Sequence, residues 1–257
     1  MPLSRSIRRL SAALVFSFVM SPCVYGQTTP AARRLLDEMI TALGGDVFLE
    51  VRTIHTSGRF FNFKRNEISA SDLYNDYVKY PDMELTEFGK DKNKTAYINR
   101  GDKGWIVSPP PKKGDPEVQE QSGSQAEEFI RSFRTALDYV VRFVLKDPRA
   151  SVISTGPDIV GFKRVDVLEI RDPDKNLIRV FLERDTRLPL KTQTRFANES
   201  VVHEDEFANW HRFDGVMTPL LVIRRKDGVK TMEIRAEFVE YNSVIPDTMF
   251  APPSGTE

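Results

Sequence analysis

Hydrophobic and polar positions alternate along much of the chain in the two-residue rhythm of β-strands. The pattern is clearest over residues 231–238, where Met232, Ile234, Ala236 and Phe238 are separated by charged side chains. A strand of this kind has one face in water and the other against apolar material. We therefore expect the charged face to meet solvent and the apolar face to meet the concave interior of a curved sheet.

Further strand patterns are separated by turn sequences, as in a meandering antiparallel sheet. Asp227-Gly228 is typical of a type I′ hairpin turn, and residues 101–104 (GDKG) indicate another hairpin. The expected strand regions are 51–63, 72–88, 95–109, 165–170, 177–183, 187–196, 201–210, 216–225 and 230–241.

Two segments have helical spacing instead. Residues 29–45 place apolar side chains three and four positions apart, with Pro30 in the first turn and Gly44-Gly45 as the stop. Residues 124–147 give the strongest helix pattern, with Ser124 as the expected N-cap and Glu127 completing a capping box. Its single apolar stripe consists of Phe129, Phe133, Leu137, Val140, Val141 and Val144.

The order of these elements predicts one α+β domain over residues 27–257. Helix, strands, a second helix and more strands follow one another, and the first strands are too few to be stable alone. We expect a strongly curved antiparallel sheet of about 10–11 strands. The proline-rich and polar stretch 109–124 is expected to be an exposed linker, and the helix 124–147 a lid.

The first 26 residues resemble an export signal. Arg5, Arg8 and Arg9 precede an uncharged apolar run, and Gly26 provides a small residue before Gln27. We expect cleavage and a periplasmic protein; the alternative is an uncleaved anchor, although the run is only half of a membrane-spanning length of roughly 20 residues. Cys23 would leave with the signal, lipidation of that cysteine being the alternative.

Charge and cysteine content exclude several classes of function. The 257 residues contain 37 basic and 37 acidic side chains, and removal of the signal leaves a net charge of about −3. Nucleic-acid binders normally carry a basic surplus, so we expect no nucleic-acid partner. Cys23 is the only cysteine, so the mature chain has neither a disulfide nor a thiolate metal site.

No motif of nucleotide binding or nucleophilic catalysis occurs in the sequence. Alternate strand positions place His203, Asp205 and His211 on one face, which leaves a metal-assisted hydrolase as one hypothesis. A solvated strand face is the simpler interpretation, and we expect no enzyme, no metal and no cofactor.

Several short motifs resemble long members of the LolA/LolB-like superfamily, the periplasmic lipoprotein carriers. They are ALGG at 42–45 before a strand near Val51, FLERDTRLPLKTQ at 181–193, FDGVMTP at 213–219 and EYNSVIPDTMFAPP at 240–253. The matching residues are Asp185, Thr186, Leu188, Pro189, Asp214, Gly215, Val216, Pro219, Asn242, Pro246, Asp247, Phe250 and Pro252. The chain departs from the short carriers in the linker at 109–124, and no residue for acyl handling can be carried over.

This resemblance implies an incomplete, strongly curved barrel with helices covering its concave face. It also implies a non-catalytic carrier or binding protein for a lipid-like or acylated ligand, with a place in outer-membrane lipoprotein sorting. Lipoproteins or another envelope protein are the implied partners, with transient membrane contact and a monomeric state. We expect Phe250 to plug the end of the barrel.

The expected ligand site combines the helix stripe with one aromatic residue from a strand. Its members are Phe129, Phe133, Leu137, Val140, Val141, Val144 and Trp105. Trp105 follows a hairpin turn and is placed at the cavity mouth, with packing in the core as the alternative. The second hypothesis for function is a protein-interaction or stress-sensor domain of the envelope on the same fold.

Overall fold

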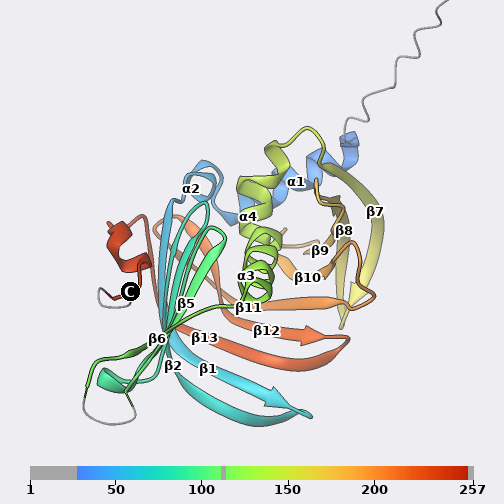
Figure 1. The fold of residues 1–257 in the computed structure, drawn as a ribbon. Coiled ribbons are helices and arrows are strands. Elements are labelled where there is room, and N and C mark those ends of the chain that lie inside the picture. Colours follow the sequence, from blue (N-terminus) through green and yellow to red (C-terminus); the bar gives the residue numbers. More distant parts are fainter. Residues whose placement is uncertain (1–27, 111–113, 254–257) are drawn as a thin grey trace, which may run out of the picture.

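A continuous antiparallel sheet organises the structure. The computed structural model describes residues 28–110 and 114–253, in which thirteen strands follow the order β6-β5-β4-β3-β2-β1-β13-β12-β11-β10-β9-β8-β7 (Figure 1). The strands are β1 (Thr53–Lys64), β2 (Glu67–Lys79), β3 (Met83–Phe88), β4 (Thr95–Arg100), β5 (Lys103–Ser108), β6 (Glu117–Glu120), β7 (Ser151–Val160), β8 (Lys163–Arg171), β9 (Leu177–Glu183), β10 (Pro189–Arg195), β11 (His203–Phe213), β12 (Val216–Lys226) and β13 (Val229–Tyr241).

The sheet consists of two meanders that the first and last strands join. β1 pairs with β13, with Phe60 opposite Ile234 and Ile54 opposite Tyr241. Asn242 follows β13, and its Oδ1 accepts a hydrogen bond of 2.7 Å from the backbone N–H of Arg52, 190 positions earlier. The pairing of β1 with β13 therefore joins a first meander, β1–β6, to a second meander, β7–β13, at the middle of the sheet.

Helices cover one face of this sheet, which is curved but not closed into a barrel (Figure 1). They are α1 (Pro30–Leu43), α2 (Asp46–Leu49), α3 (Gly123–Thr135) and α4 (Leu137–Arg142). The structure also contains three short 3₁₀ turns, η1 (Asp91–Asn93), η2 (Val144–Lys146) and η3 (Asp247–Phe250). We call the face under α1, α3 and α4 the concave face and the opposite face the outer face. The predicted α+β fold with an incomplete, curved antiparallel sheet is confirmed.

The sheet has more strands than the expected ten or eleven, because the sequence pattern does not identify the two edge strands, β6 and β7. β6 lies inside the stretch 109–124 that was expected to be a linker, and it is short and acidic. β7 contains Gly156, with φ of 95°, and Pro157 beside a register shift. Charge, proline and bulges protect sheet edges from pairing with other chains, and the same features remove the alternation that identifies a strand.

α1 begins and ends where the sequence predicts. The Thr29 hydroxyl caps it by accepting from the N–H of Ala32, and Gly44 ends it with φ of 133°. A Cβ atom on Gly44 would lie 2.6 Å from the carbonyl oxygen of Gly215. Only glycine allows both this backbone angle and this approach, which brings two of the motif segments into contact.

The main core lies between the helices and the concave face. It combines α1, α4 and the strands of the second meander, and it includes Leu36, Met39, Val51, Val140, Leu168, Ile170, Ile178, Val180, Leu182 and Val216. No helix among residues 28–110 and 114–253 combines the length and the apolar character needed to cross a membrane.

The C-terminal segment packs on the outer face of β3, β4 and β5 (Figure 1). Phe250 is fully buried there with Leu85, Ile98 and Ile245. Register places Leu85 and Ile98 on the opposite face from Glu84 and Asn99, their chain neighbours. Phe250 therefore seals the outside of the sheet, and the expectation that it plugs the barrel end is wrong.

The alternating segment 231–238 follows its prediction only in part. Glu237 has no partner across β1, because Gly58 pairs with Ala236 and Ser57 with Phe238. This bulge reverses the faces beyond it, so Phe238 is exposed while Val239 is buried. Met232, Ile234 and Ala236 keep the expected face.

Candidate ligand-binding groove

The helix expected over residues 124–147 is broken at Ala136. Its backbone there is extended, with φ of −60° and ψ of 139°, so α3 and α4 are separate helices. Ser122, not Ser124, is the N-cap, and Gln125, not Glu127, completes the capping box. Ser122 accepts a hydrogen bond from the first turn of α3, so the helix begins two residues earlier than predicted. Only Gln121 separates this N-cap from the end of β6 at Glu120.

α4 is anchored firmly to the concave face. Val140 and Val141 are buried in the main core, and Leu137 and Val144 pack against the same core. Arg142 is also buried: its Nε donates to the carbonyl oxygen of Phe48, and its Nη1 donates to Asp138 Oδ2, both at 2.9 Å. α4 therefore cannot leave the sheet without exposing apolar surface and breaking these bonds.

α3 is held much more lightly. Only Ala126 and Thr135 of its thirteen residues are buried. Phe129 and Phe133 are half-buried and lie 5.4 Å apart between ring centroids, and Phe133 reaches Tyr80 at 5.8 Å and Tyr139 at 5.5 Å. The aromatic face of α3 thus rests on other aromatic rings and remains partly open to solvent.

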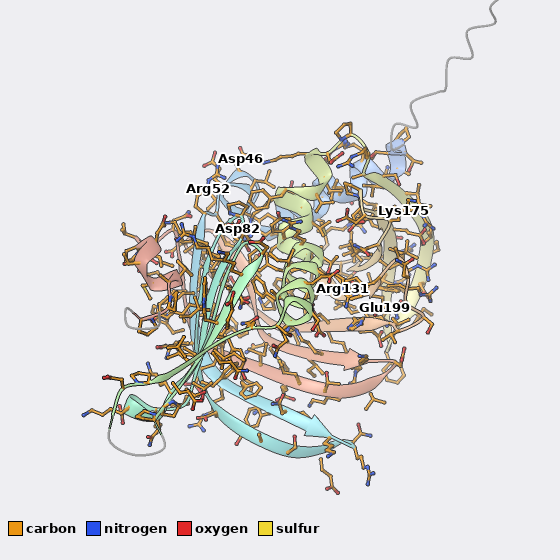
Figure 2. All side chains as sticks on the ribbon, in the orientation of Figure 1. Asp46, Arg52, Asp82, Arg131, Lys175 and Glu199 are labelled. Carbon is orange, nitrogen blue, oxygen red and sulfur yellow. The ribbon has the colours of Figure 1, made fainter. Side chains whose placement is uncertain are left out.

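A polar contact fastens α3 to the loop between β10 and β11. Arg131 forms an ion pair with Glu199, and its guanidinium lies 4.1 Å from the ring centroid of Phe196 (Figure 2). Phe196 also contacts the edge of His203, at 5.0 Å between centroids. We call the contact of Arg131 with Glu199 and Phe196 the α3 latch.

A cavity of about 310 Å³ lies between α3 and strands β10–β12. Its walls are largely polar, and they include Ser132, Thr192, Thr194, His203, Asp205 and Arg224. Arg224 Nε lies 3.2 Å from Asp205 Oδ1. The volume is at the lower end of the range of ligand pockets, roughly 300–1,000 Å³, so a larger ligand requires α3 to move.

Two further carboxyl groups face the concave side from β2 and β3. Burial raises the pKa of Asp76 to about 6, although a hydrogen bond from Thr86 and the charge of Arg224 act in the opposite direction. Burial and the neighbouring Asp76 carboxylate raise the pKa of Glu84 well above its usual value. No sequence motif marked this pair, although Asp76 occupies an inward position between Tyr74 and Val78.

Comparison with known proteins finds solved structures with the same fold, although the sequence itself matches none of the families or curated proteins compared. No protein-family model matches the sequence, and no curated protein matches it either. Solved structures do match: a DUF1329 family protein from Desulfovibrio piger has a TM-score of 0.60 at 15% identity, covering 87% of this chain and 98% of that one. The LolA superfamily protein NE2245 from Nitrosomonas europaea has a TM-score of 0.54 at 13% identity, covering 86% and 97%.

The chain has a LolA-like fold. A Vibrio parahaemolyticus domain that is named, provisionally, for outer-membrane lipoprotein sorting has the same fold, with a TM-score of 0.56 at 14% identity over 85% of this chain and 97% of that one. The resemblance that the short motifs indicate is therefore confirmed at the level of the fold.

Within the LolA-like fold, the expected site residues divide into two groups. Phe129, Phe133, Leu137, Val140, Val141 and Val144 all lie along α3, α4 and η2 over the concave face. Trp105 does not join them, because it packs with Leu85 and Ile98 in the cluster on the outer face. Its environment is that of a core residue.

The histidines of the hydrolase hypothesis do not come together. His203 and Asp205 both line the cavity under α3, whereas His211 is exposed and contacts Asn209. Among residues 28–110 and 114–253, no group of three His, Cys, Asp or Glu side chains is arranged to hold a metal ion.

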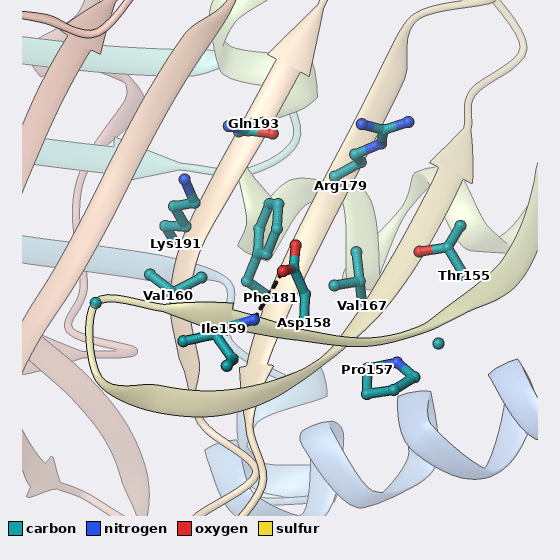
Figure 3. A pocket seen from close by; sticks show the side chains of 12 residues that line it. Thr155, Pro157, Asp158, Ile159, Val160, Val167, Arg179, Phe181, Lys191 and Gln193 are labelled. Carbon is teal, nitrogen blue, oxygen red and sulfur yellow. Dashed lines mark hydrogen bonds between the residues drawn. The ribbon is translucent and has the colours of Figure 1, made fainter.

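A second cavity, of about 460 Å³, lies on the outer face where β7 curls across β8, β9 and β10 (Figure 3). Phe181 and Lys191 form part of its wall, with the Lys191 ammonium 4.8 Å from the Phe181 ring centroid. None of the expected site residues lies there, and the aromatic face of α3 is on the other side of the sheet.

Proposed function

We propose that the chain is a non-catalytic binding or carrier protein of the bacterial periplasm, where its N-terminal signal would deliver it. Its ligand is lipid-like or acylated, and it binds between α3 and the concave face. The observation that carries this proposal is the contrast between the two helices: α4 is anchored in the core, while the aromatic face of α3 is only half-buried.

In this proposal α3 acts as a lid that turns about Ala136. The extended backbone at Ala136 separates the two helices, so α3 can move without disturbing Val140 and Val141. Opening would release the latch and expose Phe129 and Phe133 to the ligand. Transfer of an acyl chain from water to such a surface gains about 0.8 kcal/mol per buried methylene.

The LolA-like fold supports this function, because related folds include a domain named for lipoprotein sorting. The same fold would also suit an envelope protein-interaction domain. The two functions differ in what occupies the groove, which is an apolar chain in the first and a protein segment in the second.

Phe133→Asp tests the proposal. A carboxylate in the aromatic cluster should weaken binding of a fluorescent fatty-acid analogue by about tenfold, because the charge would have to be buried with the acyl chain. Phe162→Asp is the matched control, since Phe162 is fully exposed at the β7–β8 turn. Circular dichroism verifies that both variants stay folded; equal affinity of the two folded variants would contradict the proposed site.

A further inference from the structure

Two rows of side chains cross β10, β11 and β12 on the concave face. The rows consist of directly opposite residues: Thr192, Asp205 and Arg224 in the first, and Thr194, His203 and Lys226 in the second. Opposite residues share a face of a sheet, and so do residues two positions apart on one strand. All six line the cavity of about 310 Å³ under α3, so the two rows form its floor.

The threonines are the most enclosed members of this floor. Thr192 is 6% exposed and Thr194 is 8% exposed, whereas the other four residues are half-buried or exposed. The Thr135 hydroxyl, also on the cavity wall, donates to the carbonyl oxygen of Arg131, whereas no hydrogen bond between described residues involves the hydroxyl of Thr192 or Thr194. Ser132 of α3 adds a hydroxyl from the opposite wall. The cavity therefore offers hydroxyl groups, each of which can donate and accept.

Most charged side chains of the cavity already have a partner of opposite charge. Three ion pairs hold them: Asp205 with Arg224 at 3.2 Å, Glu204 with Lys191 at 3.0 Å, and Arg225 with Glu206 at 2.9 Å.

The remaining charges balance as well. Glu128 and Lys226 line the cavity, are exposed and have opposite charges. His203 lies 3.8 Å from Glu199, so its charge, when it is protonated, also meets a carboxylate. A charged group that entered this cavity would lose its hydration without meeting a surplus of the opposite charge, which is unfavourable. The cavity therefore favours a polar group without charge.

The cavity adjoins the aromatic face of α3. Glu128 and Ser132 line the cavity, and Phe129 and Phe133 follow them directly in the chain. Successive residues of an α-helix are about 100° apart around its axis. The polar cavity and the aromatic face are thus neighbouring stripes of one helix, and one ligand under α3 can contact both.

We propose that this cavity binds an uncharged polyol head group, so that the ligand is an acyl chain joined to glycerol or to a sugar. The hydroxyl groups of a polyol donate to and accept from those of the cavity. They also bond to the pair of Asp205 and Arg224 without changing its charge balance. The small volume of the cavity fits one glycerol or one monosaccharide. The inference rests on the proposed function, because the tail lies along the aromatic face of α3.

The test compares amphiphiles of equal chain length: monolauroylglycerol, dodecyl glucoside, lauric acid and dodecylamine. Each is used to displace a fluorescent acyl probe from the chain beginning at Gln27, at neutral pH and below the concentration at which micelles form. At least one polyol should bind about tenfold more tightly than the acid and the amine, which corresponds to one or two net hydrogen bonds beyond the common tail. The polyol that binds more tightly identifies glycerol or sugar as the head group.

In the Thr192→Val/Thr194→Val variant, the preference for the polyol should fall to about twofold or less, because valine keeps the branched shape and lacks the hydroxyl. Its affinity for lauric acid should equal that of the wild type. Ser132→Ala, at an exposed position of α3, should lower the preference about threefold. Thr155→Val is the matched control, because Thr155 is an exposed threonine at the cavity on the outer face, and its preference should not change.

Equal binding of polyols and charged amphiphiles to the wild type would overturn the polyol site and leave the proposed function intact. Tighter binding of the acid or the amine would do the same. A preference that survives both the double substitution and Ser132→Ala would also overturn the site, because the head group would then lie elsewhere. Displacement by none of the amphiphiles would overturn the proposed function and the inference together.

Discussion

Arg142 shows how much a single residue contributes to the position of the helices. It is 2% exposed, its guanidinium lies 4.4 Å from the ring centroid of Phe48, and its Nη1 donates to the Tyr80 hydroxyl at 2.9 Å. Burial and the adjacent Asp138 carboxylate raise the pKa of Tyr80 well above its usual value. Arg142 thus connects α4 to α2 and to the end of β2.

Arg142→Ala should lower the free energy of unfolding by about 3 kcal/mol, because it leaves the buried carbonyl oxygen of Phe48 without its donor and removes a large buried side chain. Urea denaturation measures the change. Arg149→Ala is the control, since Arg149 pairs with Asp147 at the surface and its loss should have little effect. A similar loss of stability in both variants would show that Arg142 does not link the elements as described.

The sequence could not reveal this role for Arg142. The helical stripe of Val140, Val141 and Val144 places position 142 on the opposite, solvent-facing side of a regular helix. The side chain is buried because Phe48 and Tyr80, both distant in sequence, close over that side. Such a contact depends on tertiary structure and has no local pattern.

At the scale of elements, the break between α3 and α4 is the feature that divides a fixed part from a movable part. Alanine is the strongest helix former, so nothing local at Ala136 indicates an interruption. The break follows from two different packing partners: Val140 and Val141 face the main core, whereas Phe133 faces Tyr80. One straight helix could not satisfy both.

Removal of the latch should loosen α3 alone. In Arg131→Ala, amide hydrogen exchange over residues 123–135 should become about fivefold faster, since a partly exposed ion pair and a cation–π contact are lost. Exchange over residues 137–142 should not change, because α4 is anchored separately. Association with the acyl probe should become faster as well.

Arg134→Ala is the matched control for this prediction, because Arg134 is an exposed arginine of the same helix. Its exchange rates should equal those of the wild type. If exchange in Arg131→Ala rises equally in α3 and α4, the two helices open as one unit and Ala136 is not the hinge.

In the molecule as a whole, the two faces of the sheet have different roles. The outer face of β3–β5 is sealed by the C-terminal segment, while the concave face carries the groove. The alternation along each strand predicts two different faces but does not reveal which one is concave. The sequence therefore predicts the open sheet and its helices. It does not show that Trp105 packs on the outer face, so the placement of Trp105 in the groove is wrong.

Phe250→Ala should lower the stability of the protein without changing its affinity for the ligand. Loss of a fully buried phenylalanine should cost about 3 kcal/mol of stability, measurable by chemical denaturation. Affinity for the acyl probe should stay the same, because Phe250 and the groove lie on opposite faces of the sheet. Weaker binding by the folded variant would mean that the C-terminal segment takes part in the ligand site.

Native mass spectrometry of the chain beginning at Gln27, purified from a bacterial periplasm and extracted with organic solvent, tests the central claim most directly. We expect a discrete added mass that extracts as a lipid-like molecule and is reduced in Phe133→Asp but kept in Phe162→Asp. A protein without added mass, together with no binding of fluorescent fatty-acid analogues, would contradict a carrier of apolar ligands. The interaction domain would then be the better account of this fold.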